Sequence, residues 1–286
     1  MSSIVVSEER ALSPYRASAP LTDDWKHFDF TLEQGVATVT FNRPDKLNAL
    51  TFDAYADLRD LIDELPHRGD VRVVVIAGAG RGFCSGGDVE EIIAELLKLD
   101  THELLEFTRM TGAVVKALRE VPLPVIAAVN GIAAGAGSVI ALAADLRLLA
   151  DSASFAFLFT KVGLAGADMG SAYLLPRIVG LGRATELLLL GDKIDARAAQ
   201  DIGLASNVVA DEKLREETTT LAKRLSSGPA FAYATTKTLL TRELDQDLGS
   251  SIELEAVTQA LMMHSKDFNE FYRAWSEGQE PDWRGR

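Results

Sequence analysis

The chain has 286 residues, of which 47% are hydrophobic, and a formal net charge of −13. A chain of this length and hydrophobicity can bury a substantial core, so a disordered or low-complexity protein is excluded. The acidic balance, with a pI near 4.8, argues against nucleic acid or an anionic membrane as the main partner. A negatively charged ligand would therefore need a local basic patch.

The chain has one cysteine, Cys84, which rules out an internal disulfide framework and a cysteine-rich zinc site. Its four histidines show no ligand spacing, so no metal site is predicted. No apolar run has the length of a membrane span, and residues 1–25 resemble neither a signal peptide nor a transit peptide. We expect a soluble cytoplasmic protein with a flexible N-terminal arm at residues 1–25.

The first half of the chain carries clear strand and helix signals. Residues 28–41 alternate apolar and polar side chains across a turn at Gly35, which is typical of a β-hairpin. A helix capped by Thr51 is expected next, because apolar residues then recur at helical spacing. Residues 73–77 and 124–129 are short and continuously apolar, as strands covered on both faces are.

A glycine-rich segment and a helical pattern follow each of these two strands, and this alternation predicts the α/β class. Strand signals nearly vanish beyond about residue 183. We therefore predict a spiral core over residues 26–205 and a helical C-terminal subdomain over residues 206–286. Helices are expected at residues 89–98, 102–119, 138–144, 183–190, 195–202, 212–226, 230–242, 250–264 and 266–277, and a further strand at 146–150.

The two glycine-rich segments have three interpretations. They lack the Walker pattern that cradles phosphate and the spacing of a dinucleotide fingerprint. A single such turn would be explained by tight packing alone. However, Gly86-Gly87 and Gly135-Ala136-Gly137 both lie between a strand and a helix, where small residues expose unpaired N–H donors to a ligand. Two converging N–H groups are what an enolate or tetrahedral oxyanion needs.

Several motifs together resemble the crotonase (enoyl-CoA hydratase/isomerase) superfamily. They are FCSGGD at residues 83–88, NG-x-x-x-G-x-G at 130–137, Asp145 with an arginine two residues later, the loop 42–49, and Gly203-Leu204-Ala205-Ser206. The resemblance covers residues 28 to about 280. It implies a ββα spiral with a C-terminal helical part that assembles as trimers or pairs of trimers.

The resemblance also implies the site. The N–H groups of Gly87 and Ala136 would form an oxyanion hole for a thioester carbonyl, with coenzyme A bound as part of the substrate and no further cofactor. The loop 42–49 would receive the adenosine of CoA. The residues expected to contact CoA are Lys46, Asn48, Ala49, Gly87, Asp88, Val89, Glu90 and Ala136.

The sequence departs from the hydratase pattern at both catalytic glutamates. The first position is Val139, and the second falls at or next to Phe159. No glutamate occurs between Glu120 and Glu186. Water addition by a pair of glutamates is therefore not supported.

Asp168 is an acid that remains in this region, between a glycine turn and an amphipathic helix. On local sequence alone, an N-cap for that helix is the favoured interpretation. Family members with an aspartate before a similar Gly-x-x-x-Leu-Pro-Arg run include ring-expanding 1,2-epoxyphenylacetyl-CoA isomerases and dienoyl-CoA isomerases, and aroyl-CoA dehalogenases have an aspartate nearby. In these members it serves as proton shuttle or nucleophile at the acyl chain. The resemblance therefore makes Asp168 the predicted proton shuttle.

The leading interpretation is an isomerase that acts on an acyl-CoA through a stabilised enolate. Alternatives are a hydratase with a non-standard acid or base, an acyl-CoA hydrolase or dehalogenase, and a non-catalytic CoA-binding member. Glu106 is a weak candidate for a second acid, although a solvated position is favoured. Tyr173 could donate into the pocket or belong to the core, and Lys237 and Arg242 could meet CoA phosphate or be surface charge.

Overall fold

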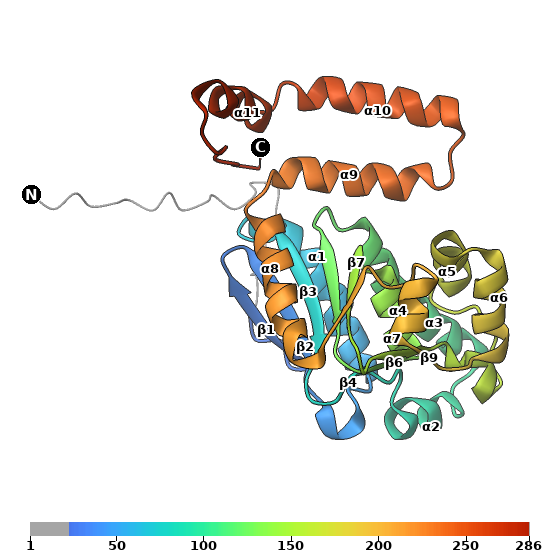
Figure 1. The fold of residues 1–286 in the computed structure, drawn as a ribbon. Coiled ribbons are helices and arrows are strands. Elements are labelled where there is room, and N and C mark those ends of the chain that lie inside the picture. The colour runs from blue at the N-terminus through green and yellow to red at the C-terminus, as the bar shows by residue number, and fades with distance from the viewer. Residues whose placement is uncertain (1–22, 286) are drawn as a thin grey trace, which may run out of the picture.

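The computed structural model describes residues 23–285, and two β-sheets form its centre (Figure 1). The larger sheet has six strands in the order β1-β2-β3-β5-β7-β10, and only β1 runs antiparallel to its neighbour. These strands are β1 (Phe28–Glu33), β2 (Val36–Phe41), β3 (Val73–Gly78), β5 (Val125–Val129), β7 (Leu146–Ala150) and β10 (Asn207–Val209). The predicted hairpin and the three predicted apolar strands are confirmed.

A second sheet of four short strands was not predicted from the sequence. Its order is β4-β6-β8-β9, with β4 (Gly82–Cys84), β6 (Ile132–Ala134), β8 (Ser154–Ala156) and β9 (Ile194–Asp195). Each of β3, β5 and β7 in the large sheet is followed directly by a strand of the small sheet. This alternation forms the ββα spiral that we expected, and the α/β fold class is confirmed.

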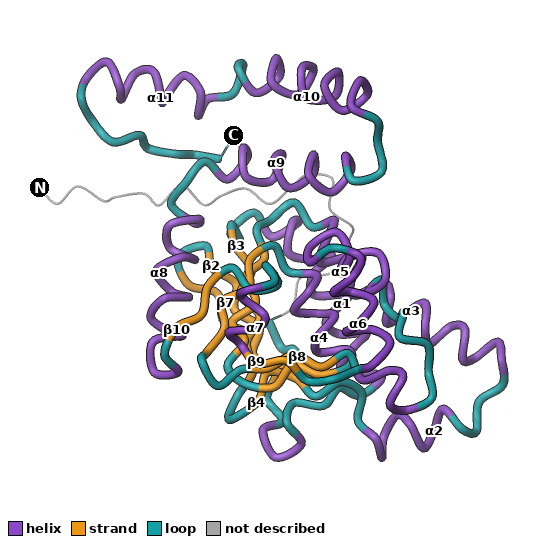
Figure 2. The backbone as a smooth tube through the Cα atoms, turned by 45° about the vertical axis from the view of Figure 1, so that its right-hand side comes forward, coloured by secondary structure: helices purple, strands orange, loops and turns teal. Residues whose placement is uncertain are grey.

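The helices cover both sides of the large sheet (Figure 2). On one side α8 packs against β3, β5 and β7, while α1, α3 and α4 lie on the other. The α-helices are α1 (Phe52–Arg68), α2 (Ala94–Leu96), α3 (Thr101–Glu120), α4 (Ala136–Ala143), α5 (Ser171–Val179), α6 (Leu181–Leu190), α7 (Ala196–Asp201), α8 (Leu214–Ser226), α9 (Ala230–Glu243), α10 (Leu248–Met262) and α11 (Lys266–Glu277). The predicted cap is present, since the Thr51 hydroxyl accepts from the N–H of Ala54 at 3.2 Å.

The last three helices lie beyond one end of the sheets (Figure 1). Beyond residue 183, where strand signals nearly vanish, the structure has only two short strands within the described residues, β9 and β10. In addition, α8 packs on the large sheet rather than with α9 to α11. The division of the chain between residues 205 and 206 stays a prediction, and most of the proposed arm, residues 1–22, lies outside the described residues.

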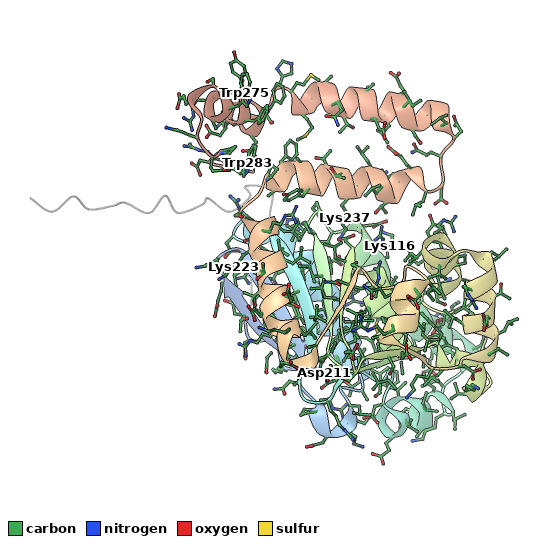
Figure 3. All side chains as sticks on the ribbon, viewed as in Figure 1. Lys116, Asp211, Lys223, Lys237, Trp275 and Trp283 are labelled. Carbon is green, nitrogen blue, oxygen red and sulfur yellow. The ribbon has the colours of Figure 1, made fainter. Side chains whose placement is uncertain are left out.

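Lys237 links this C-terminal part to the core, so its interpretation as a CoA contact or surface charge was wrong. Figure 3 shows it between α9 and the sheets. Its ammonium donates to the carbonyls of Leu118 at 2.8 Å and Leu123 at 2.9 Å, and pairs with Asp145 at 2.9 Å. The side chain is only 6% exposed. Lys237 thus holds the end of α3 and the start of β5 against α9.

Replacing Lys237 with methionine should therefore lower the free energy of unfolding by about 3–5 kcal/mol, because it leaves two carbonyls and a carboxylate without their buried partner. Urea denaturation would measure the change. Lys223→Met is the matched control, since Lys223 is exposed on α8 and should shift stability by less than about 0.5 kcal/mol. An equal effect of the two substitutions would contradict this role.

Candidate active site

The two glycine-rich segments form turns, Gly86-Gly87 and Gly135-Ala136-Gly137, which we call the glycine turns. They lie side by side because the strands before them are neighbours. β4 and β6 pair in parallel, with Gly82 opposite Ile132 and Cys84 opposite Ala133. Parallel strands end at the same edge of a sheet, so the residues that follow both strands meet there. A side-chain Cβ built on Gly86 would lie 3.4 Å from the nitrogen of Ala136 and 3.1 Å from the oxygen of Ala134.

Each turn presents a backbone N–H without an acceptor. Ala136 is the first residue of α4, so its N–H cannot bond within the helix. Gly87 lies opposite Leu50 in a β-bridge, but both hydrogen bonds of the bridge are made by residues next to Gly87. Leu50 donates to the Gly86 carbonyl, and Asp88 donates to the Leu50 carbonyl, so the Gly87 N–H takes no part. Within residues 23–285, neither the Gly87 N–H nor the Ala136 N–H has a hydrogen-bond acceptor. The pair has the chemistry of an oxyanion hole.

The close approach of the turns requires small residues. A Cβ on Gly137 would lie 2.1 Å from the carbonyl oxygen of Cys84. Gly137→Ala should therefore force the turns apart and lower the free energy of unfolding by about 1–3 kcal/mol. Chemical denaturation would show this, with Gly182→Ala as control. Gly182 lies in α6 with no atom within 4 Å of its Cβ position, so alanine should slightly stabilise that helix.

The loop 42–49 is fixed against the first turn by Asn48. Its amide donates to the carbonyls of Ala79 at 2.9 Å and Gly82 at 2.8 Å, and its oxygen accepts from the Arg43 N–H at 2.9 Å. Asn48 has a φ of 58°, a conformation that asparagine tolerates. The side chain of Asn48 is therefore engaged within the protein, and that of Ala49 is buried. Any contact of these two residues with CoA would involve the backbone.

Ion pairs join this loop to the helix after Gly87. Lys46 pairs with Glu90 at 2.6 Å, and Arg43 pairs with Glu91 at 2.5 Å and with Asp88 at 3.1 Å. The pairing with Glu90 raises the pKa of Lys46. An incoming phosphate would thus compete with carboxylates for these cations.

The first residues after Gly87 differ in exposure. Asp88 is 3% exposed, and its carboxylate caps the π-helical segment Val89–Ile93 by accepting from the N–H groups of Glu90 and Glu91. Val89 and Glu90 are open to solvent, at 72% and 78% exposed. The helix expected over residues 89–98 is thus split into this segment and the short α2.

Both glutamate positions of the hydratase pattern are buried and apolar. Val139 is 0% exposed in α4, and Phe159 is 7% exposed in the short helix after β8. Neither side chain can move a proton. Asp168 is therefore the candidate acid or base in place of the two hydratase glutamates.

Asp168 lies in a rigid loop before α5. Its N–H donates to the Ser171 hydroxyl at 3.1 Å, and Ser171 in turn donates to the Gly166 carbonyl at 3.2 Å. The carboxylate accepts from the N–H of Met169 at 2.8 Å and makes no capping bond to α5, whose N-cap is Gly170. The N-cap interpretation was therefore wrong. Partial burial raises the pKa of Asp168, which suits a general base.

Three other candidates lie apart from this carboxylate. Glu106 is 69% exposed on α3, next to His102. Tyr173 is partly buried and packs against the core, as the core interpretation predicted, while its hydroxyl donates to Asp245 at 2.7 Å and Arg177 covers its ring. Cys84 is fully buried, and burial raises the pKa of its thiol to about 12, so the thiol does not serve as a nucleophile.

One polar group near the glycine turns was not predicted from the sequence as part of the site. Tyr55 is 3% exposed in α1, and its hydroxyl oxygen lies 3.8 Å from the position of a Cβ on Gly87. It occurs three residues before Leu58 on the apolar face of the helix, so helical spacing assigns it to the core. Nothing in the local pattern indicates a role for its hydroxyl.

The fold is that of the crotonase superfamily, and the two N–H groups are donors of the kind that can hold an oxyanion. The enoyl-CoA hydratase/isomerase family model matches residues 31–286, and the chain belongs to this family.

Similar proteins differ in their named activities. The chain is 34% identical to 1,2-epoxyphenylacetyl-CoA isomerase from Escherichia coli K12 over 89% of this chain and 97% of the relative. It is 38% identical to a "probable enoyl-CoA hydratase" from Rhodobacter capsulatus, over 90% of this chain and 97% of that relative. A crystal structure described as a "putative enoyl-CoA hydratase" from Streptomyces coelicolor A3(2) has 58% identity and a TM-score of 0.94, covering 96% of this chain and all of that one.

Proposed function

We propose that the protein is an isomerase-type enzyme that moves a proton along the acyl chain of an enoyl-CoA. The Gly87 and Ala136 N–H groups would hold the thioester oxygen as it gains charge. Asp168 would take an acidic proton from the acyl chain and return it at another carbon. Coenzyme A would belong to the substrate, bound along residues 46–49 and 87–90, and no further cofactor would take part.

The observation that carries this proposal is the environment of Asp168. It is a half-buried carboxylate with a raised pKa, in a chain whose two hydratase glutamate positions are Val139 and Phe159. One carboxylate can remove and return a proton in turn, whereas the hydratase pattern uses two. The relative named 1,2-epoxyphenylacetyl-CoA isomerase also supports an isomerase function. Residues 23–285 contain no cluster of three or more potential metal ligands.

Product analysis would test this function. The enzyme is incubated with 2-enoyl- and 3-enoyl-CoA thioesters, and the products are separated and weighed by mass spectrometry. The proposal predicts interconversion of the double-bond isomers without a change in mass. A dominant product heavier by one water would establish the hydratase alternative instead. A covalent acyl or aryl adduct on Asp168 would favour the hydrolase or dehalogenase.

The pH dependence of the rate should report the raised pKa of Asp168. Because burial favours the protonated form, the carboxylate loses its proton above the ordinary aspartate value of about 4. The base form is the active one, so kcat/KM should fall as the pH drops through that raised value. A pH–rate profile would measure the acid limb. A limb at or below the ordinary aspartate pKa would contradict Asp168 as the base.

We also propose that the enzyme is a homo-oligomer, a trimer or a dimer of trimers, in the cytoplasm. Many large apolar side chains on α9 to α11 are exposed in the single chain, and subunit contacts would cover them. They are Phe231, Leu240, Leu244, Leu248, Ile252, Val257, Leu261, Met263, Phe268, Phe271, Tyr272 and Trp275. Sedimentation velocity would measure the assembly. No helix in residues 23–285 is long and apolar enough to cross a membrane.

A further inference from the structure

Tyr55 is a buried side chain with a polar group beside Gly87 that the proposed chemistry leaves unused. It lies in the second turn of α1, and its ring packs edge-on to Phe107 of α3 with the centroids 6.2 Å apart. Phe107 is also held by Phe52, at 5.1 Å. The aromatic packing fixes the ring of Tyr55 and therefore fixes where its hydroxyl lies.

The hydroxyl faces the space beside the first oxyanion donor. Its oxygen and the Cδ1 atom of Ile92 lie 3.8 Å and 3.6 Å from the position of a Cβ on Gly87. Within residues 23–285 the Tyr55 hydroxyl has no hydrogen-bond partner, although the residue is only 3% exposed. The hydroxyl oxygen does not belong to the fully buried unpaired polar atoms of the described residues, so it reaches accessible space and is free to donate. A ligand beside Gly87 is the natural partner.

Asp168 lies near enough to Tyr55 for its carboxylate to affect the pKa of the hydroxyl. Burial raises the pKa of the Tyr55 hydroxyl well above its usual value, and the negative charge of the Asp168 carboxylate raises it further. The phenol is therefore neutral at any working pH and acts as a donor rather than a base. An acyl group that runs from Gly87 to Asp168 would pass this donor.

We propose that Tyr55 is a specificity-determining residue whose hydroxyl donates to an oxygen atom carried by the acyl group near its thioester. This inference rests on the proposed function only for the path of the acyl group between Gly87 and Asp168. The thioester oxygen already has two donors, Gly87 and Ala136, so the third donor is free for a substituent. A site built to bond a substrate oxygen discriminates strongly against the analogue that lacks it.

Equilibrium binding of two matched ligands tests this inference. 3-Methoxybutyryl-CoA and 3-methylpentanoyl-CoA have the same shape, but the first has an ether oxygen where the second has a methylene. Both are saturated, so neither undergoes a double-bond shift. By titration calorimetry, the wild-type protein should bind the ether at least about tenfold more tightly. In Tyr55→Phe the preference should vanish, mainly through weaker binding of the ether.

Tyr272→Phe is the matched control, because Tyr272 belongs to α11, beyond the end of the sheets, and should keep the wild-type preference. Equal affinities of the wild type for both ligands, or an unchanged preference in Tyr55→Phe, would overturn the inference. The wild-type comparison needs no substitution, so it holds even if Tyr55→Phe folds poorly. Binding is measured without turnover, so failure of the proposed isomerase chemistry would appear in the product analysis and not in these affinities.

Discussion

Asp168→Asn should lower turnover of enoyl-CoA substrates by about 10²–10⁴-fold, the usual contribution of a general acid–base. Asparagine keeps an oxygen that can accept from the Met169 N–H, so the loop should be preserved. It cannot take a proton. Incorporation of solvent deuterium into the acyl chain should fall together with the rate, because both require the same proton transfer.

The folded state of this variant should be at least as stable as the wild type at neutral pH. Since burial raises the pKa of Asp168, folding favours its neutral form. The stability that this preference contributes is present below the unfolded pKa and is lost as the pH rises through the folded pKa. Asparagine stays neutral throughout, so its melting temperature should equal or exceed that of the wild type at pH 7. The difference should disappear below a pH of about 4.

Asp201→Asn is the control, because Asp201 is exposed on α7. It should leave turnover and deuterium incorporation unchanged. Full turnover by Asp168→Asn on every substrate that the wild type converts would remove Asp168 from the mechanism. Loss of turnover together with loss of folded protein would show a structural role instead.

Ala136→Pro should lower kcat by about 10²–10³-fold, the effect of losing one oxyanion donor. Ala136 is the first residue of α4, a position where proline fits the helix and where the N–H has no intrahelical acceptor. The substitution therefore removes the proposed donor and keeps the helix. The proline ring also enters the space beside Gly86, whose Cβ position lies 3.4 Å from the Ala136 nitrogen, so KM should rise as kcat falls.

The matched control is Lys266→Pro, at the exposed first position of α11. It should leave kcat unchanged, and circular dichroism should show the same helix content in both variants. A kcat of Ala136→Pro within about threefold of the wild type would contradict the assignment of Ala136 to the oxyanion hole.

Much of the core could be predicted because its strands are long enough to show a pattern. Residues 73–77 and 124–129 are apolar throughout, and the hairpin alternates. By contrast, β4, β6 and β8 have three residues each, too few for a periodic signal. Most of their residues are small, and such residues are also typical of loops. The second sheet was therefore not predicted, although it positions both glycine turns.

The backbone part of the site was predictable, and the side-chain part was less so. The family resemblance, rather than glycine spacing alone, assigned Gly87 and Ala136, and the structure shows that their turns approach closely enough to require small residues. The surroundings of a side chain depend on distant segments. Sequence alone therefore missed the unpaired Tyr55 hydroxyl and the burial of Lys237 against Leu118 and Leu123.

A crystal structure with a saturated acyl-CoA bound would test the central claim most directly. The account predicts the thioester oxygen at about 2.7–3.1 Å from the nitrogens of both Gly87 and Ala136. It also predicts the Asp168 carboxylate within about 3.5 Å of acyl carbons that can exchange a proton. A thioester oxygen bound elsewhere, or another carboxylate at the acyl carbons in place of Asp168, would contradict the account.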